Sequence, residues 1–221
     1  MARFSTIIFD LDGTLLDTLA DIAGAANQVL EQVGAPAAPV DHYRYYVGDG
    51  VINLFSRALP EELRTEDNVQ SCVNSFGKAY SQHWNIHTKP YKGIPELLAS
   101  LLSARLRTAV LSNKPHEFTK QCIAGFLPEH PFHLVLGQSD LIPPKPDPTG
   151  LLNVVQTLKV SPENCLYVGD TATDMQTAVA VGMFAVGVTW GFRPRQELVE
   201  SGAQALIDCP DELLELISPT G

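Results

Sequence analysis

Short runs of apolar and β-branched residues recur along this chain and are typical of buried strands. The first run occupies residues 5–10, and five others follow after residue 100, namely "RTAVLS", "HLVLG", "NCLYVG", "MFAVGVTW" and "ALID". Between these later runs, residues 116–126, 149–158 and 173–181 carry apolar positions at helical spacing. Strands that alternate with helices favour a parallel sheet covered by helices on both faces.

The stretch between the first strand and the later ones has a different pattern. Residues 19–33 show one apolar face at helical spacing, with Asp17 or Thr18 as a candidate N-cap and Gly34 as a stop. Residues 35–88 remain helical in character, but prolines and glycines interrupt them and no strong strand pattern occurs there. This stretch is therefore predicted to be all-helical.

The simplest arrangement of these elements is a core into which a second unit is inserted. We predict an α/β fold with a doubly wound parallel-sheet core, formed by residues 1–15 and 89–221. An all-helical cap domain, residues 16–88, is expected to follow the first strand. The hydrophobic content of 45% is enough to bury a core of this size.

The charge balance of the chain is acidic, with 25 Asp and Glu residues against 15 Lys and Arg residues and a formal net charge of -10. Binding to a nucleic-acid backbone needs a basic face, so we expect no nucleic-acid partner. An anionic small-molecule substrate would require a local positive centre within this acidic chain.

Cysteine usage and hydropathy favour the cytoplasm. The four cysteines are far apart and form no C-x-x-C pair, which is typical of buried thiols in a reducing compartment. The longest apolar stretch, 178–190, is too short to span a bilayer. Asp10 and Asp12 interrupt the early apolar run that a signal peptide would need. We expect a cytoplasmic protein without a membrane partner, and the sequence leaves both a monomer and a homodimer open.

Polar residues follow four of the predicted strands, directly or after a short loop. In parallel sheets of this type, ligands bind at the carboxyl ends of the strands, so these residues are candidates for one shared site. They are Asp10, Asp12, Gly13 and Thr14 after the first strand, Ser112, Asn113 and Lys114 after "RTAVL", Lys145 after "HLVLG", and Asp170 and Asp174 after "NCLYVG".

This set of side chains favours phosphoryl transfer. Several carboxylates beside one lysine suit Mg²⁺, which prefers oxygen ligands, offsets the repulsion between the acids and polarises a phosphoryl oxygen. The Ser112 hydroxyl and the Lys145 ammonium can hold other phosphoryl oxygens. An aspartate carboxylate can itself attack phosphorus and form an aspartyl-phosphate intermediate.

Four motifs also match a known family. They are "DLDGT" at 10–14, "LSNKP" at 111–115, Lys145 in "KPDP", and "VGDTATD" at 168–174. In this order they resemble the haloacid dehalogenase superfamily of phosphatases and, within it, the phosphoglycolate phosphatase-like group with a helical cap. The resemblance covers nearly the whole chain and implies a Mg²⁺-dependent phosphatase.

The resemblance implies catalytic and metal-binding roles for four aspartates. Asp10 corresponds to the nucleophile, and Asp12 to the general acid that protonates the leaving oxygen and then the base that activates water. Mg²⁺ would be held by the Asp10 carboxylate, the Asp12 backbone carbonyl and the Asp170 side chain. Asp174 would support these ligands through water or hydrogen bonds. Family members that remove halide usually lack an aspartate at the position of Asp12, which argues against a dehalogenase.

The resemblance also implies a phosphate-binding set of Thr14, Ser112, Asn113 and Lys145. Ser112 and Lys145 correspond to the phosphoryl-binding pair, and the backbone of Asn113 would assist them. Thr14 is similar to the family's residue that helps to position Asp12.

In the predicted cap, "YYVGDGVINLFSRAL" is similar to the family segment whose Gly-x-Gly turn faces the active site. Gly48, Asp49 and Gly50 are therefore expected to contact substrate, because glycine lets the backbone approach a small ligand closely. Arg57 is a weaker candidate for an anion contact. Lys114 is interpreted as a solvated lysine rather than a substrate contact.

The leading interpretation is a phosphomonoester hydrolase that acts on a small phosphorylated metabolite through an aspartyl-phosphate, with 2-phosphoglycolate as the first candidate by resemblance. Alternatives within the family are a sugar-phosphate mutase, which passes the phosphoryl group back instead of to water, and an inorganic pyrophosphatase. An alternative of another class is a receiver-like module, in which Asp10 stores a phosphoryl group without turnover. Such modules are usually shorter and lack an inserted cap.

Overall fold

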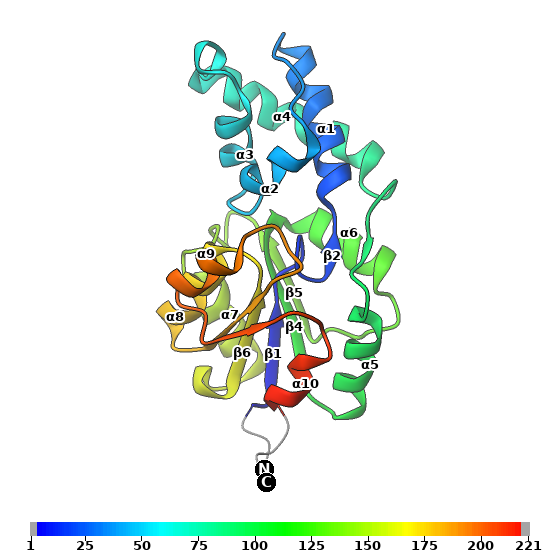
Figure 1. The fold of residues 1–221 in the computed structure, drawn as a ribbon, viewed down its shortest axis with the longest axis vertical. Helices are drawn as coiled ribbons and strands as arrows, with labels where there is room; N and C mark the ends of the chain where they lie inside the picture. The colour runs from blue at the N-terminus through cyan, green and yellow to red at the C-terminus, as the bar shows by residue number, and fades with distance from the viewer. Residues whose placement is uncertain (1–3, 218–221) are drawn as a thin grey trace. The chain divides into compact units, whose positions relative to one another are not determined.

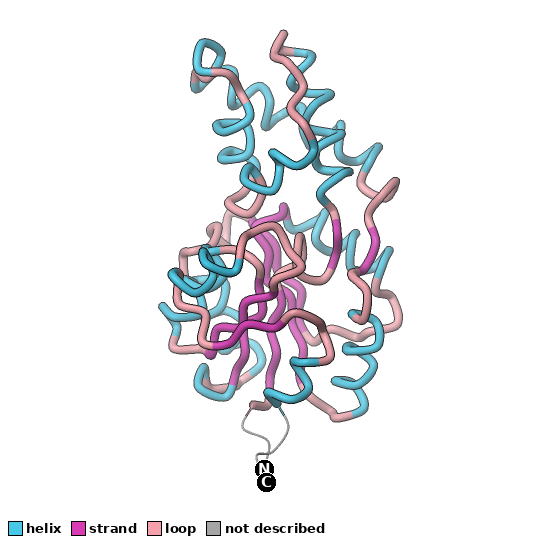
Figure 2. The backbone as a smooth tube through the Cα atoms, viewed as in Figure 1, coloured by secondary structure: helices cyan, strands magenta, loops and turns pink. Residues whose placement is uncertain are grey.

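The computed structural model describes residues 4–217 of the chain. The chain forms two compact units. Unit 1 comprises Met1–Leu16 and Pro90–Gly221, and unit 2 comprises Asp17–Lys89. Unit 1 contains the main sheet, whereas unit 2 is built of helices (Figure 2).

Unit 1 is organised around a six-stranded parallel sheet with the order β5-β4-β1-β6-β7-β8. From the central strand β1, the sheet grows to β4 and β5 on one side and to β6, β7 and β8 on the other. Ligands bind in such sheets where the strand order reverses, at the carboxyl ends of the strands. The strands are β1 (Thr6–Phe9), β4 (Arg107–Pro115), β5 (Leu134–Gln138), β6 (Cys165–Gly169), β7 (Phe184–Val188) and β8 (Ala205–Ile207).

Helices cover this sheet on both sides. Figure 1 shows α7, α8 and α9 on one side and α5 and α10 on the other. A buried cluster joins Ile8, Ala109 and Tyr167 of the strands to Leu151 of α7 and Met175 of α8. The predicted doubly wound α/β core is therefore confirmed. The helices of unit 1 are α5 (Ile94–Ser103), α6 (His116–Phe126), α7 (Thr149–Leu158), α8 (Ala172–Val181), α9 (Arg195–Glu200) and α10 (Glu212–Ile217).

Unit 2 packs its helices around an apolar and aromatic interior. Helix α1 buries the side predicted from its spacing and packs along α4. Phe76 of α4 stacks on Tyr80 at a ring-centroid distance of 5.5 Å and meets Phe55 of α3 edge-on at 5.7 Å. The α-helices are α1 (Leu19–Gln32), α2 (Tyr43–Tyr46), α3 (Val51–Ala58) and α4 (Glu66–His83).

The end of unit 2 is tied back to its first helix by one buried carboxylate. Asp21, in the first turn of α1, accepts hydrogen bonds from the backbone N–H groups of Ile86, His87 and Thr88 at 2.9–3.0 Å. The Thr88 hydroxyl donates to the same carboxylate at 2.7 Å. These bonds satisfy the charge of a side chain that is 2% exposed, because several donors to one carboxylate replace its lost hydration.

Two short strands, β2 (Leu16–Asp17) and β3 (Lys89–Pro90), pair in a separate two-stranded sheet. The sequence did not predict them, since a strand of two residues is too short to show the alternation by which strands are recognised. Thr18, one of the two candidate N-cap residues, does precede α1. Its side chain, however, makes no capping hydrogen bond.

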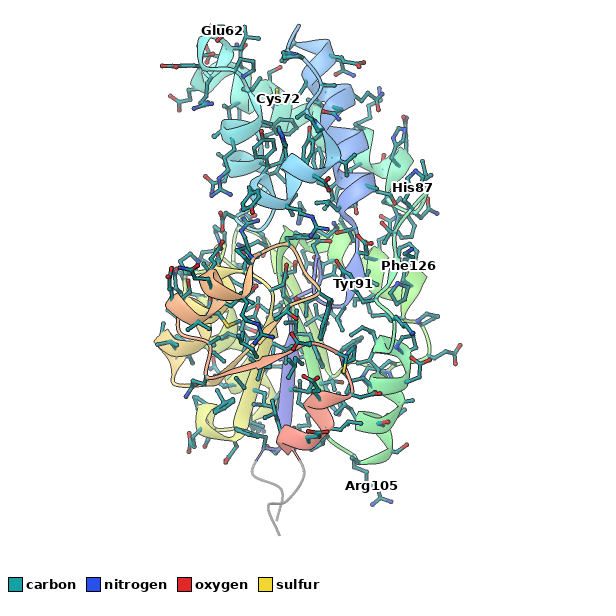
Figure 3. All side chains as sticks on the ribbon, in the orientation of Figure 1. Glu62, Cys72, His87, Tyr91, Arg105 and Phe126 are labelled. Atoms are coloured by element: carbon teal, nitrogen blue, oxygen red, sulfur yellow. The ribbon has the colours of Figure 1, made fainter. Side chains whose placement is uncertain are left out.

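All four cysteines lie in the described part of the chain, and all four are free thiols. Cys72, inside unit 2 (Figure 3), is buried, as are Cys122 and Cys165. Cys209 is exposed, so the expectation of buried thiols is wrong for this residue. Among residues 4–217, no helix combines the length and the apolar character that crossing a membrane requires.

Candidate active site

The polar residues expected at the strand ends are brought to one edge of the sheet by the register of three adjacent strands. Phe9, the last residue of β1, lies opposite Val110 of β4 and Val168 of β6. The next residue, Asp10, donates its backbone N–H to the Val168 carbonyl at 2.9 Å. The residues that follow each strand therefore emerge side by side, and Asp10 and Asp170 meet at this edge.

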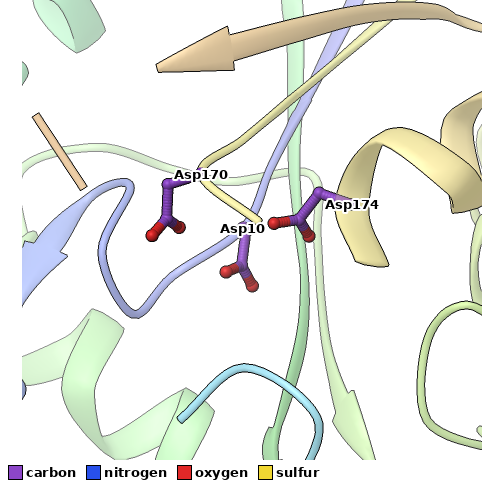
Figure 4. A group of neighbouring side chains, drawn as sticks. All are labelled: Asp10, Asp170 and Asp174. Atoms are coloured by element: carbon purple, nitrogen blue, oxygen red, sulfur yellow. The ribbon is translucent and has the colours of Figure 1, made fainter. Parts of the chain in front are cut away.

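Three aspartates form a buried carboxylate cluster at this edge. One carboxylate oxygen from each of Asp10, Asp170 and Asp174 lies within 4.8 Å of the others. Figure 4 shows the three side chains converging from separate segments of the chain. Asp10 is 5% exposed, and the other two are fully buried. Carboxylates that lie this close together and are buried from water repel one another unless positive charge compensates them.

Part of that compensation comes from Lys145. Its Nζ atom lies 2.8 Å from Asp10 Oδ1 and 2.6 Å from Asp174 Oδ1. The hydroxyl of Tyr167, on β6, lies 2.8 Å from the same nitrogen, and it donates to the Leu111 carbonyl at 3.0 Å. Lys145 is 4% exposed, so its ammonium group is held by these partners rather than by water.

The Asn113 side chain holds Lys145 in place. Its Oδ1 atom accepts the backbone N–H of Lys145 at 2.6 Å, and its Nδ2 atom donates to the Lys145 carbonyl at 3.1 Å. The peptide bond between Lys145 and Pro146 is cis. The family resemblance implied that the Asn113 backbone assists phosphate binding. In the structure the Asn113 side chain also connects β4 to the loop that carries Lys145.

Asp174 is fixed at the start of α8. Its Oδ2 atom accepts the backbone N–H of Thr171 at 3.0 Å and the Thr171 hydroxyl at 2.7 Å. The Asp174 N–H donates to the Thr171 hydroxyl oxygen at 3.4 Å, which closes a capping box. Its Oδ1 atom faces Lys145 and Tyr167. Both oxygens of Asp174 are therefore engaged by protein groups.

Asp170 is held tightly by its surroundings. Its Oδ1 atom accepts the Thr14 hydroxyl at 2.9 Å, and its Oδ2 atom accepts the Phe192 backbone N–H at 2.8 Å. A β-carbon added to Gly13 or Gly191 would lie 2.3 Å or 2.2 Å from Asp170 atoms, so only glycine fits at either position. Thr14 was expected to position Asp12, but its hydroxyl positions Asp170.

Burial and mutual repulsion shift the acid–base properties of this cluster. Burial raises the pKa of Asp10 from its ordinary 3.8 to about 7, because the attraction of Lys145 offsets only part of the cost of dehydration. Burial, with Asp174 and Asp10 nearby, holds the pKa of Asp170 well above its ordinary value. Burial alone would lower the pKa of Lys145, but Asp10 and Asp174 hold it well above its usual range.

The donor set fits a divalent cation. The Lys145 ammonium pairs with two of the three carboxylates, those of Asp10 and Asp174, so the cluster keeps an excess of negative charge when all three are ionised. Carboxylate oxygens are the ligands that Mg²⁺ prefers. Asp10, Asp170 and Asp174 each offer a carboxylate oxygen from which such an ion could be held.

Asp12 forms a second charged pair beside the cluster. The Nζ atom of Lys114 lies 3.0 and 3.1 Å from the two Asp12 carboxylate oxygens. The side chains of Lys114 and Asp12 are 5% and 11% exposed, so the interpretation of Lys114 as a solvated lysine is wrong. The Ser112 hydroxyl, at the same edge, accepts the backbone N–H of Lys114 at 3.2 Å.

Within unit 2, the Gly-x-Gly turn has the backbone geometry that its sequence suggested. Gly48 and Gly50 have φ angles of 121° and 87°, which favour glycine. Arg57 forms an ion pair with Asp49 and donates to the Tyr45 carbonyl at 3.2 Å. Arg57 therefore stabilises this turn through Asp49 and the Tyr45 carbonyl. That Gly48, Asp49 or Gly50 contacts substrate stays a prediction.

Sequence reasoning missed one side chain of the site, Tyr167, and misinterpreted another, Lys114. Tyr167 occupies an alternating position in a buried strand, so it is indistinguishable from a core residue until the fold brings its hydroxyl to Lys145. Lys114 lies inside a matched motif, two residues from Ser112, and its position was a usable signal. The Phe192 N–H that binds Asp170 is a backbone group and has no sequence signal.

Comparison with known proteins places this geometry in a family. Residues 7–188 match the family model described as haloacid dehalogenase-like hydrolase. The chain therefore belongs to the haloacid dehalogenase-like hydrolases, and it is an enzyme of the phosphatase group of this family.

Among its relatives, a phosphoglycolate phosphatase from Thiobacillus denitrificans is 31% identical over 91% of this chain and 90% of its own length. Two proteins predicted to be phosphoglycolate phosphatases have similar crystal structures. The one from Lactobacillus delbrueckii subsp. bulgaricus is 31% identical, with a TM-score of 0.92 over 98% of this chain and 99% of that one. The one from Haemophilus somnus is 28% identical, with a TM-score of 0.91 over 99% and 100%.

Proposed function

We propose that this protein is a Mg²⁺-dependent phosphomonoesterase that acts on a small phosphorylated metabolite through an aspartyl-phosphate on Asp10. The observation that carries the proposal is the buried cluster of Asp10, Asp170 and Asp174 at the carboxyl end of the central strand, with the Lys145 ammonium paired to Asp10 and Asp174. A dry site with several acids and one fixed cation is suited to a phosphoryl group and a divalent ion.

In the first step, a carboxylate oxygen of Asp10 attacks phosphorus, and the bond from phosphorus to the ester oxygen breaks. Asp12 gives its proton to that oxygen, so the leaving group departs as an alcohol. In the second step, Asp12 takes a proton from water, the water oxygen attacks phosphorus, and the bond to Asp10 breaks. The products are inorganic phosphate and the original carboxylate of Asp10.

The phosphoryl oxygens need partners that do not have to reorganise during the reaction. Lys145 supplies a charge fixed by its neighbours, and the Asn113 side chain holds the backbone that carries it. The Ser112 hydroxyl, 3% exposed at the end of β4, is the second expected partner. Thr14 takes part through Asp170 rather than by a phosphate contact. Preorganised donors of this kind stabilise developing charge strongly.

Mg²⁺ would be held by the Asp10 and Asp170 carboxylates and by the Asp12 backbone carbonyl, with Asp174 supporting them. When bound, the ion would neutralise the excess negative charge and polarise a phosphoryl oxygen. The raised pKa of Asp10, about 7, and that of Asp170 support this assignment, since both acids gain from a cation that keeps them ionised.

2-Phosphoglycolate is the first substrate to test, because relatives over nearly the whole chain carry the name phosphoglycolate phosphatase. The acidic chain, with its formal net charge of -10, disfavours a nucleic-acid partner. Free thiols at all four cysteines are consistent with the expected cytoplasmic location.

The test is a phosphate-release screen over 2-phosphoglycolate, sugar phosphates, nucleotides and pyrophosphate, each with Mg²⁺ and with chelator. We expect many phosphates released per chain with Mg²⁺, and loss of release in chelator or in Asp10→Asn. Stoichiometric release of phosphate from a monoester excludes a mutase, and preference for pyrophosphate would make the chain a pyrophosphatase. At most one phosphate per chain would leave only the receiver-like module.

A further inference from the structure

Lys114 occupies a position in the site that the reaction described above does not use. Its ammonium group contacts both oxygens of Asp12, at 3.0 and 3.1 Å. Exposed ion pairs contribute little and exchange readily with water, but these side chains are 5% and 11% exposed. A buried ammonium that faces the general acid is therefore part of the site, and it needs an explanation in terms of substrate.

The backbone around Lys114 is held in a fixed, irregular conformation. The pairing of β4 with β5 shifts register between Ser112 and Pro115. Within this irregular segment, the Lys114 N–H donates to the Ser112 hydroxyl at 3.2 Å, and its carbonyl accepts the Thr119 hydroxyl at 3.1 Å. A bulge of this kind re-aims a side chain at the end of a strand. The position of the Lys114 ammonium is thus built into the strand.

The two lysines of the site have separate partners. Lys145 lies among Asp10, Asp174 and Tyr167, on the side where the phosphoryl group would be attacked. Lys114 accompanies Asp12, the residue that would protonate the leaving oxygen. One cation is therefore placed for the phosphoryl group, and the other is placed for the leaving group.

We propose that Lys114 is a specificity-determining residue that binds a carboxylate on the leaving group, next to the carbon that bears the ester oxygen; this inference rests on the proposed function. The ester oxygen must come within about 3 Å of an Asp12 oxygen to receive its proton. Lys114 lies a similar distance from that same carboxylate. A substrate carboxyl carbon that is one bond of about 1.5 Å from the ester-bearing carbon falls within reach of the ammonium.

The substrate class is therefore that of phosphate esters of 2-hydroxy acids, of which 2-phosphoglycolate is the smallest. Phosphate esters of neutral alcohols offer no negative group on the leaving alcohol for Lys114 to bind. A site built around a buried charge discriminates strongly against an analogue that lacks the matching group.

The experiment compares 2-phosphoglycolate with ethyl phosphate, which has the same number of carbons and no carboxylate, in the wild type, Lys114→Met and Lys114→Arg. In Lys114→Met we expect kcat/KM for 2-phosphoglycolate to fall on the order of 100-fold, mainly through KM. For ethyl phosphate kcat/KM should fall much less, because this ester loses the support that Lys114 gives to Asp12 but no contact of its own, so the preference for 2-phosphoglycolate should narrow. Lys114→Arg keeps the charge and should retain much of the preference.

The ratio of the two kcat/KM values is measured in one protein sample, so an inactive fraction cancels from it. An equal loss on both substrates in Lys114→Met would mean that Lys114 acts only on Asp12, and it would overturn the proposal. An unchanged preference for 2-phosphoglycolate would overturn it as well. The proposed function fails separately, if wild-type protein with Mg²⁺ releases phosphate from none of the esters in the screen described above, whereas hydrolysis of other esters without a preference for 2-phosphoglycolate over ethyl phosphate would overturn only the role of Lys114.

Discussion

Asp10→Asn should stabilise the metal-free protein while it abolishes turnover, and the gain should depend on pH. The folded-state pKa of Asp10 is about 7 and its ordinary value is 3.8. The folded chain therefore binds more protons than the unfolded chain between about pH 4 and pH 7. In this window the free energy of unfolding falls as pH rises, because ionisation of Asp10 is costly in the buried cluster. Asparagine does not ionise and escapes this loss.

The size of the effect follows from the pKa values. At about 1.4 kcal/mol per pKa unit, the rise from 3.8 to about 7 corresponds to roughly 4 kcal/mol in all, and roughly 2.5 kcal/mol of this falls between pH 5 and pH 8. The advantage of Asp10→Asn over the wild type should widen by that amount across the interval. Urea unfolding in the presence of chelator at pH 5 and at pH 8 measures it.

Two controls separate this effect from others. Asp140→Asn removes one negative charge at an exposed position and should change stability by less than about 0.5 kcal/mol at both pH values. Adding Mg²⁺ at pH 8 should stabilise the wild type more than Asp10→Asn, since only the wild type offers the full set of carboxylates. A difference between Asp10→Asn and the wild type that stays constant from pH 5 to pH 8 would refute the reasoning.

Three further substitutions test the supports of the site and of unit 2. Tyr167→Phe removes the hydroxyl that donates to the Leu111 carbonyl and contacts the lysine, and it should cost about 1–3 kcal/mol in urea unfolding. Asp21→Asn removes a buried carboxylate that serves three backbone N–H groups, and it should cost about 2–3 kcal/mol by the same measurement. Gly191→Ala places a β-carbon 2.2 Å from the Asp170 β-carbon, and it should raise the Mg²⁺ concentration for half-maximal activity roughly 10–100-fold.

Each of these substitutions has an outcome that contradicts its basis. A wild-type unfolding midpoint for Tyr167→Phe or Asp21→Asn would mean that the hydrogen bonds named contribute nothing net. For Gly191→Ala the matched control is Gly24→Ala, where the added carbon meets nothing within 4 Å and helix stability should rise by up to about 1 kcal/mol. An unchanged Mg²⁺ requirement in Gly191→Ala would show that Asp170 tolerates displacement.

Much of the fold could be read from residue periodicity. Helices α6 and α7 occupy 116–126 and 149–158, as predicted, and each predicted strand has a counterpart in the sheet. Periodicity succeeds here because these elements bury one face or both against a single core, which imposes a regular apolar pattern. It fails at β2 and β3, which consist of two residues each and so have no period to detect.

The site was predicted as a set of residues but not as a set of contacts. The motif residues that follow β1 and β6 and those in the last part of β4 do converge, since these strands are neighbours in the sheet. The partners differ from expectation in two cases. Thr14 binds Asp170 instead of Asp12, and Asn113 uses its side chain on the Lys145 backbone. Which residues far apart in the chain become hydrogen-bond partners depends on the conformation of the loops. The local sequence contains little information about that conformation.

The sequence by itself determined which chemical groups the protein carries and at which strand ends they emerge. It did so because strand boundaries and motif residues are local features of the chain. Only the tertiary structure decided how the charges are distributed: Lys145 among Asp10 and Asp174, and Lys114 on Asp12. The physical reason is that pairing in a buried site depends on distance and dehydration, and both arise only when segments 29 to 135 residues apart in the chain pack against each other.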